Sequence, residues 1–223
     1  MKFDSHDAAK TRPTTATPLV VGAVLLAAGA GSRLGNRPKS LLELDGVPLI
    51  ARLLAALSTA NVHDVVVVLG HHADAIEKAI RGTAATLIRN PKPDDGQAVS
   101  LRLGLSALGR AHDAVIVALA DQPLINAQDI NDLIHAFVHR ADAQLVVPRV
   151  SGKPGNPVII DALLRDEWLA GDVDNTGRRW REHNAARVLW FDSPNVNYRV
   201  DIDSEEDRTL FRENTGRTLQ WPT

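Results

Sequence analysis

Short apolar runs alternate with longer, helix-patterned segments along most of the chain. Apolar residues follow one another without alternation, as in strands covered on both faces, in the runs 19–26, 64–70, 114–120 and 143–148. Apolar residues recur at helical spacing in the segments 48–60, 73–82, 96–109 and 126–141. Because the predicted strands and helices alternate along the chain, the pattern predicts βαβ units with right-handed crossovers and a mainly parallel sheet.

The last third of the chain is less regular. Residues 155–160 and 187–191 are candidate strands, and a helix is expected over 204–214, where Ser204 precedes two glutamates. The predicted fold is therefore α/β, a three-layer α/β/α sandwich with a Rossmann-like sheet.

The chain has no internal repeat and no clear linker, which predicts one domain over residues 19–215. Residues 1–18, rich in Thr, Pro and charge, are expected to form a disordered N-terminal leader, and residues 216–223 a C-terminal tail.

Length, composition and charge narrow the possible functions. The 223 residues suit one domain, and a 44% hydrophobic content with only 4% aromatic residues predicts an aliphatic core. A net charge of −2 gives no general basic field, so we expect no nucleic-acid partner and no membrane binding. The lack of cysteine excludes disulfides, thiolate metal sites and a cysteine nucleophile. No apolar run is long enough to span a membrane, and the expected location is cytoplasmic.

The first predicted strand runs directly into a loop of small residues and cations. Residues 27–36 contain three glycines and Arg33, and Lys39 follows shortly after. Ligands of open α/β sheets bind beyond the carboxyl ends of strands, and glycines let backbone N–H groups approach phosphates closely. The dinucleotide fingerprint fails, because Leu34 stands where it needs glycine, and the P-loop triplet is missing. The loop is predicted to bind phosphates in another way, with a flexible turn carrying surface cations as the alternative.

The segment "LAAGAGSRLGNRPKSLLEL" closely resembles the signature of the MobA-like NTP transferase family, in particular its molybdenum cofactor guanylyl- and cytidylyltransferases. That signature reads L-A-A/G-G-x-x-x-R-x-G with a lysine after a short gap. The resemblance implies a fold of the nucleotide-diphospho-sugar transferase type, with Arg33, Lys39 and Asp121 as catalytic residues. It also implies a nucleotide-binding loop whose members are Leu26, Ala27, Ala28, Gly29, Ala30, Gly31, Ser32 and Arg33. The two alanines would lie against the base, and Lys39 would hold the α-phosphate oxygens.

Nucleotidyl transfer needs a metal ion more than a protein nucleophile, because the phosphates of both substrates repel each other. Mg²⁺ prefers oxygen ligands and usually takes one or two carboxylates plus phosphate oxygens. Asp121 follows a predicted buried strand, and "LADQP" resembles the family's metal-binding L-x-D-x-P segment. Capping of the next turn is the alternative role for this aspartate.

A second metal ligand is expected from "DIDSEED", which resembles the family ending D-I-D-T-P-E-D. Asp201 and Asp203 alternate along an extended stretch, so only one of them is expected to face the site. Asp203 is favoured over Asp201, and capping of the following helix is the alternative for both. The expected cofactor is Mg²⁺.

Two further segments resemble substrate-binding parts of the family. Residues 90–108 match the stretch over base and ribose, which implies that Asn90, Gly96 and Ser100 bind the nucleotide, although part of this match could be core packing. "SGKPGNPVII" resembles a G-H-P-V segment that faces the acceptor, with Asn156 in place of histidine. The expected acceptor-binding residues are Gly155, Asn156, Asp172 and Arg178. The histidines, His71 and His72 included, show no transition-metal spacing and are expected at the surface.

The resemblance implies a Mg²⁺-dependent enzyme that transfers CMP from CTP to the terminal phosphate of molybdopterin and releases pyrophosphate. The "LAAG" and "ADQP" versions of the motifs favour CTP over GTP. A molybdoenzyme or its maturation chaperone is a further expected partner. The alternatives are GTP as the donor, a sugar or alcohol phosphate as the acceptor, and a non-catalytic nucleotide- or cofactor-binding accessory protein.

Overall fold

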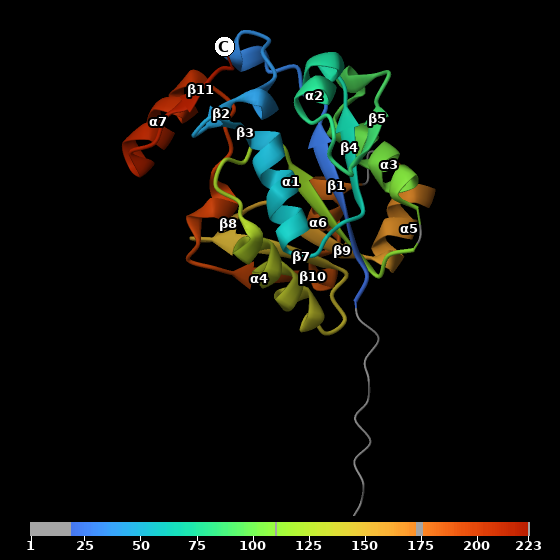
Figure 1. Ribbon diagram of the computed structural model, residues 1–223. Helices are drawn as coiled ribbons and strands as arrows, with labels where there is room; N and C mark the ends of the chain where they lie inside the picture. Colours follow the sequence, from blue (N-terminus) through green and yellow to red (C-terminus); the bar gives the residue numbers. More distant parts are fainter. Residues whose placement is uncertain (1–18, 110, 173–175, 223) are drawn as a thin grey trace, which may run out of the picture.

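The computed structural model describes residues 19–109, 111–172 and 176–222, so the expected leader 1–18 lies outside the described residues. The main sheet has the strand order β10-β7-β9-β6-β1-β4-β5, with the short β8 paired to β7 (Figure 1). Its strands are β1 (Val21–Ala27), β4 (Val65–Leu69), β5 (Thr86–Arg89), β6 (Ala114–Leu119), β7 (Leu145–Val150), β8 (Lys153–Pro154), β9 (Val158–Asp161) and β10 (Val188–Asp192).

The sheet is mainly parallel, as the sequence predicts. β1 pairs in parallel with both β4 and β6, β4 with β5, and β7 with β10. Among the described strands of this sheet, β9 runs antiparallel between β6 and β7, and the short β8 runs antiparallel to β7. The chain order reverses beside β1, since β4 and β5 lie on one side of it and β6 on the other. Such a switch point is where open α/β sheets form a ligand crevice.

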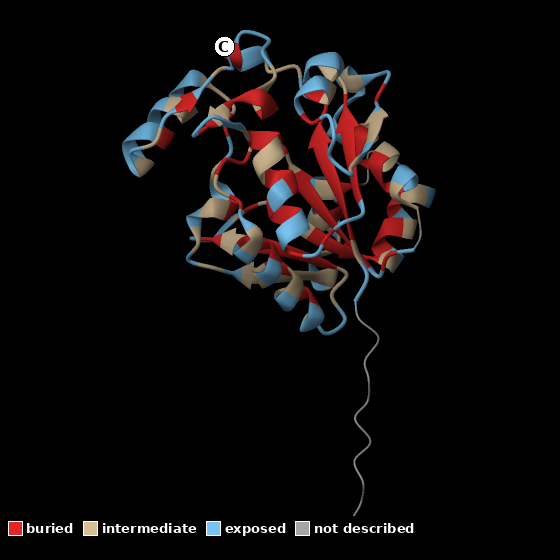
Figure 2. Cartoon of the chain, viewed as in Figure 1, coloured by how far each residue is buried: buried red, intermediate tan, exposed pale blue. Residues whose placement is uncertain are grey.

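Helices cover both faces of the sheet. Alternate residues of β1 explain the two layers, because Ala23 and Leu25 pack in one core cluster and Val24 and Leu26 in the other. The helices are α1 (Leu49–Thr59), α2 (Ala73–Ala79) and α4 (Ala127–Val138) on the first face, and α3 (Gln97–Leu108), α5 (Ala162–Ala170) and α6 (Gly177–His183) on the second. The predicted α/β/α sandwich is thus confirmed, and Figure 2 shows the buried central strands between the layers.

A small second unit packs beside the carboxyl edge of the sheet. Its three-stranded sheet comprises β2 (Glu43–Leu44), β3 (Val47–Pro48) and β11 (Leu219–Gln220), and it adjoins α7 (Glu205–Thr215) (Figure 1). Leu44, Phe211 and Leu219 share its apolar core. The segment 216–223, expected as a tail, therefore contributes a strand. No helix in the described part of the chain is both long and apolar enough to cross a membrane.

Candidate active site

The loop after β1 and the turn after β6 lie next to each other at the carboxyl edge of the sheet. Leu26 pairs with Leu119, and the backbone N–H of Ala120 donates to the carbonyl of Leu26 at 3.1 Å. A cleft of about 300 Å³ opens here. It is lined by Leu26, Ala27, Ala28, Gly29, Pro38, Lys39, Ser40, Ile76, Pro93, Gln97, Ser100, Leu119, Ala120, Asp121, Asp201 and Asp203.

An ionic cluster forms one wall of this cleft. The Nζ of Lys39 donates to Oδ2 of Asp121 at 2.6 Å and to Oδ1 of Asp203 at 2.5 Å. Arg33 donates to the other oxygen of Asp203 at 2.6 Å. Asp121 and Asp203, which are 82 and 164 residues from Lys39 along the chain, thus meet at its ammonium group. The structure brings together the predicted catalytic residues and one predicted metal ligand.

Pairing between these groups keeps them charged in spite of their burial. Burial acts to lower the pKa of Lys39, but the carboxylates of Asp121 and Asp203 outweigh it and raise that pKa. Burial likewise acts to raise the pKa of Asp203, yet the bonds and charge of Lys39 and Arg33 hold it below its usual value. Asp201, which also borders the cleft, has a raised pKa because it is buried near two other carboxylates. Lys39 and Asp203 are therefore charged at neutral pH.

The chemistry of the cluster suits a divalent cation with oxygen ligands. Oδ1 of Asp121 is buried and has no hydrogen-bond partner among the described residues, so it can still accept a ligand bond. The two carboxylates that hold Lys39 already converge on one positive charge. The described residues contain no preformed group of three or more metal-ligating side chains. Two carboxylates without a third agree with Mg²⁺, which completes its shell with phosphate oxygens and water.

Both aspartates of the "DID" segment border the cleft, whereas strict alternation would allow only one. The segment 200–203 is not a strand, and the backbone N–H of Ile202 bonds the carbonyl of Asp121 at 3.1 Å. Ile202 points into the core of the small unit, where it is 1% exposed. This anchor holds both flanking carboxylates on the side of the cleft.

The loop after β1 has a backbone that suits phosphate binding. Gly31 has φ 66°, and a Cβ there would lie 1.9 Å from the carbonyl oxygen of Arg37. At Gly29 a Cβ would meet nothing within 4 Å, so this residue borders open space in the cleft. A short 3₁₀ helix, Ser32–Leu34, follows Gly31 directly. Only glycine fits the first of these positions without strain.

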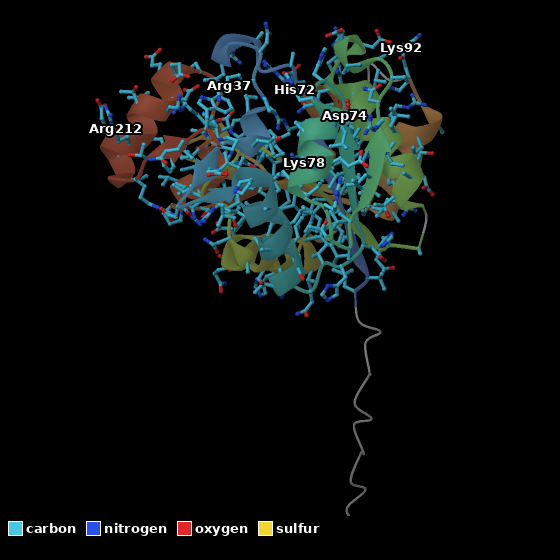
Figure 3. The ribbon with its side chains drawn as sticks, turned by 45° about the horizontal axis from the view of Figure 1, so that its top comes forward. Arg37, His72, Asp74, Lys78, Lys92 and Arg212 are labelled. Carbon is cyan, nitrogen blue, oxygen red and sulfur yellow. The ribbon has the colours of Figure 1, made fainter. Side chains whose placement is uncertain are left out.

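Two histidines that the sequence places at the surface instead support this loop. The ring Nε2 of His72 lies 2.9 Å from the carbonyl oxygen of Ala30, and the N–H of His71 donates to the carbonyl of Ala28. Figure 3 brings this edge of the molecule forward and labels His72 at the start of α2 and Arg37 in the loop. These contacts join residues about forty positions apart, so no local pattern could have indicated them.

The predicted base-side residues divide into lining and supporting groups. Ser100 lines the cleft, and its Oγ accepts from Nδ2 of Asn90 at 3.0 Å. Asn90 is itself buried behind the wall and also accepts from the backbone N–H of Lys92. Gln97, at the first turn of α3, also lines the cleft, although no motif in the sequence pointed to it.

A second cleft of about 450 Å³ adjoins the first, because Leu26, Gln97 and Leu119 line both. It contains the predicted residues Gly96, Asn156 and Arg178. Its floor is apolar and its rim cationic, and the remaining lining residues are Asp95, Ala98, Leu101, Val117, Leu145, Val147, Val158, Trp168, Thr176, Gly177, Arg179 and Arg181.

The other two predicted acceptor residues do not line either cleft. Gly155 packs against Tyr198, where a Cβ would lie 2.4 Å from the backbone oxygen of that tyrosine. Its N–H donates to the carbonyl of Pro148, so this glycine shapes the turn before Asn156. Asp172 lies after α5 and is exposed.

The sequence that forms this glycine loop and ionic cluster matches a known family of proteins. The pattern of the MobA-like NTP transferase domain matches residues 23–188. The chain belongs to this family. This is a family of NTP transferase domains, and the matched range of the chain includes the glycine loop, Lys39 and Asp121. Asp201 and Asp203 lie beyond the matched residues.

Several known proteins are similar to this MobA-like chain. Nicotine blue oxidoreductase from Paenarthrobacter nicotinovorans is 35% identical over 158 residues, which cover 68% of this chain and 75% of that protein. A nucleotidyl transferase from Methanothermobacter thermautotroptrophicus superposes with a TM-score of 0.68 and 27% identity, covering 87% of this chain and 97% of that one.

Two other similarities concern a structure of lower identity and a group of longer proteins. Molybdopterin-guanine dinucleotide biosynthesis protein A from Archaeoglobus fulgidus shares the fold, with a TM-score of 0.64, 18% identity and coverage of 87% and 98% of the two chains. The chain also matches bifunctional GlmU proteins but spans only about a third of their length, 33% for that of Sorangium cellulosum at 30% identity.

Proposed function

We propose that this transferase moves CMP from CTP to the terminal phosphate of molybdopterin and releases pyrophosphate. The observation that carries the proposal is the cluster of Lys39, Asp121 and Asp203 beside a glycine loop at the switch point of the sheet. A protein that only bound a nucleotide would not need two carboxylates in the same wall, because they repel its phosphates.

The chain's own residues act by positioning and by charge. Backbone N–H groups of residues 27–31 face the triphosphate, and Arg33 neutralises part of its charge. Lys39 exchanges its carboxylate contacts for α-phosphate oxygens when CTP binds. An oxygen of the acceptor phosphate then attacks the α-phosphorus, and the bond from this phosphorus to the β-phosphate oxygen breaks, so pyrophosphate leaves. No covalent enzyme intermediate is needed.

Asp121 and Asp203 are the proposed Mg²⁺ ligands, with Asp201 beside them. The unpartnered buried oxygen of Asp121 and the two converging carboxylates support this assignment. Mg²⁺ held by these residues would neutralise phosphate charge and polarise the phosphoryl group. Before the nucleotide binds, the same carboxylates hold Lys39 beside the position that the phosphates will take.

The second cleft is the proposed acceptor site. Its apolar floor includes Trp168, whose buried Nε1 has no partner among the described residues, and its rim has the guanidinium of Arg181. An acceptor with a flat, partly apolar ring system and a phosphate fits both features. The name of the Archaeoglobus fulgidus protein supports molybdopterin as that acceptor, and the "LAAG" and "ADQP" motifs support CTP as the donor. A molybdoenzyme or its chaperone is the proposed recipient of the product.

The similarity to the nicotine blue oxidoreductase of Paenarthrobacter nicotinovorans favours a second candidate. The name of that protein is that of an oxidoreductase acting on nicotine blue, so membership of the family does not by itself fix the reaction. A redox reaction would make no use of paired carboxylates that converge on a cation. For this reason nucleotidyl transfer is our first proposal.

Pyrophosphate release tests the two candidates. The protein is incubated with Mg²⁺ and CTP, GTP, UTP or ATP, each with molybdenum-loaded molybdopterin, with a sugar or alcohol phosphate, or with no acceptor. We expect release only with CTP plus the pterin, and loss of release in Lys39→Ala. Release with GTP alone would refute the donor, and release with a sugar or alcohol phosphate would refute the acceptor. No release with any nucleotide, together with decolourisation of nicotine blue by NADH or NADPH, would establish the oxidoreductase instead.

Arg178 provides a separate test of the acceptor cleft. Its side chain lines the cleft and bonds Glu182 at 2.8 Å on an exposed helix face. Arg178→Gln should raise the KM for the pterin and leave the KM for CTP unchanged. A change in the KM for CTP alone would place the acceptor elsewhere.

A further inference from the structure

Asp129 is a buried carboxylate that the reaction does not use. It lies in the first turn of α4, is 2% exposed, and makes no ion pair with any described cation. A carboxylate is stable in such a place only when its oxygens accept hydrogen bonds. Its partners therefore indicate what it stabilises.

These partners come from two separate parts of the chain. The backbone N–H of Asn126 donates to Asp129 at 3.0 Å and completes the capping box of α4. From the opposite side, Nδ2 of Asn195 donates to it at 2.6 Å and Nδ2 of Asn197 at 3.0 Å. The hydroxyl of Tyr198 donates to the backbone carbonyl of Asp129 at 2.7 Å. One residue thus fastens the segment 195–198 to the start of α4.

Each of these two parts leads directly to a proposed metal ligand. The α4 cap at Asn126 is five residues after Asp121, and Tyr198 is three and five residues before Asp201 and Asp203. Beyond this junction, the backbone bond from Ile202 to Asp121 links the two ligand segments. The relative position of Asp121 and Asp203 therefore depends on the bonds of Asp129.

We propose that Asp129 is a positioning residue that sets the distance between the two metal-binding segments. The inference rests on the proposed function, since it assigns Asp121 and Asp203 to the metal. The charge matters because three donors face the side chain. An asparagine would offer only one acceptor oxygen and would turn its own NH₂ toward a donor.

Asp129→Asn tests the proposal in two ways, neither of which needs turnover. Hydrogen–deuterium exchange of the metal-free protein reports on the segment 196–203, and titration with Mn²⁺ in the presence of CTP reports on metal affinity. We expect several-fold faster exchange in this segment. The Mn²⁺ dissociation constant should rise by up to about tenfold, the lower end of the range for groups that bond a metal ligand directly, because Asp129 acts on the ligands only through the segments that carry them. In turnover, kcat should fall while the KM for CTP changes little.

Asp161→Asn is the matched control. Asp161 is also a buried aspartate that caps a helix, since it accepts from the N–H of Leu164 at 2.8 Å. It pairs with Ala114 at the start of β6, roughly 23 Å along that strand from Asp121. This variant should lose stability without changing the exchange of 196–203 or the affinity for Mn²⁺.

Equal behaviour of the two variants would overturn the proposal. If Asp129→Asn does not fold, Tyr198→Phe removes one bond of the junction and keeps its buried ring, with the same effects expected in smaller size. The double variant Asp129→Asn with Asn197→Asp restores a carboxylate to the junction and should recover part of the Mn²⁺ affinity. Because exchange is measured without nucleotide, its result stands even where no pyrophosphate is released.

Discussion

Lys39→Met is expected to destabilise the metal-free protein and to increase the stabilisation that a divalent cation provides. Methionine keeps much of the length and apolar contact of the lysine stem but removes the ammonium group. Asp121 and Asp203 then face each other without the cation that lies 2.6 and 2.5 Å from them. The metal-free protein should lose stability, and a divalent cation should now restore more of it than in the wild type.

The size of the effect follows from how far the three side chains are buried. The exposed fractions are 19% for Lys39, 16% for Asp121 and 31% for Asp203. Removing one partner of a fully buried pair costs about 3–5 kcal/mol. Solvent screening and the remaining bond from Arg33 reduce this, so we expect about 1–3 kcal/mol. For a chain of this size that lowers Tm by about 2–10 °C.

The assay is thermal unfolding with and without Mg²⁺, followed by single-turnover kinetics with CTP and the pterin. Mg²⁺ should raise the Tm of Lys39→Met more than that of the wild type, while the rate of transfer falls about 100- to 1000-fold. Lys78→Met is the control, because Lys78 is exposed on α2 at the same edge of the molecule (Figure 3). An unchanged Tm and no added response to Mg²⁺ in Lys39→Met would refute the bridging role of Lys39.

Further variants test the glycine loop and the ion pair between Glu167 and Arg187. Gly31→Ala should lower the free energy of unfolding by about 1–3 kcal/mol and weaken CTP binding in calorimetry, because its Cβ would meet the carbonyl oxygen of Arg37. Gly35→Ala is the control, since Gly35 has φ 68° but open space around it, and it should affect binding less. Equal losses in the two variants would contradict the steric reason. The hydrogen bond from Arg187 holds the pKa of Glu167 below 4.5, so this carboxylate stabilises the fold above pH 4.5 and loses that effect as the pH falls through its lower folded pKa. Glu167→Gln should therefore lower Tm at pH 7 and match the wild type in strong acid, and a Tm difference that does not depend on pH would argue against this ion pair.

The sequence predicts most clearly the strands whose burial is continuous. The partly buried β10 at one edge of the sheet is indicated only as a candidate strand over 187–191. Val65–Leu69 is buried throughout and stands out as an apolar run. Thr86–Arg89 is only four residues long and half-exposed at the edge of the sheet, so β5 was not predicted. The two-residue strands β2, β3 and β11 have no periodicity at all, and they form because distant segments share the core around Leu44 and Leu219.

The candidate site shows the same division. Arg33, Lys39 and Asp121 could be named because fixed spacing and strand ends are local properties of the sequence. The supporting roles of His72 and Asp129 depend on contacts across 42 and 66 or more residues, which no local pattern encodes.

Transfer of the α-phosphorus of CTP tests the central claim most directly. CTP labelled with ³²P at the α-position is incubated with Mg²⁺, molybdenum-loaded molybdopterin and either wild type or Lys39→Met. Nucleotidyl transfer predicts that the label moves from CTP to the pterin in the wild type and that label at the γ-position leaves as pyrophosphate. Lys39→Met should do both about 100- to 1000-fold more slowly. Label from the γ-position on the acceptor, or no transfer by a protein that binds both substrates, would contradict the account.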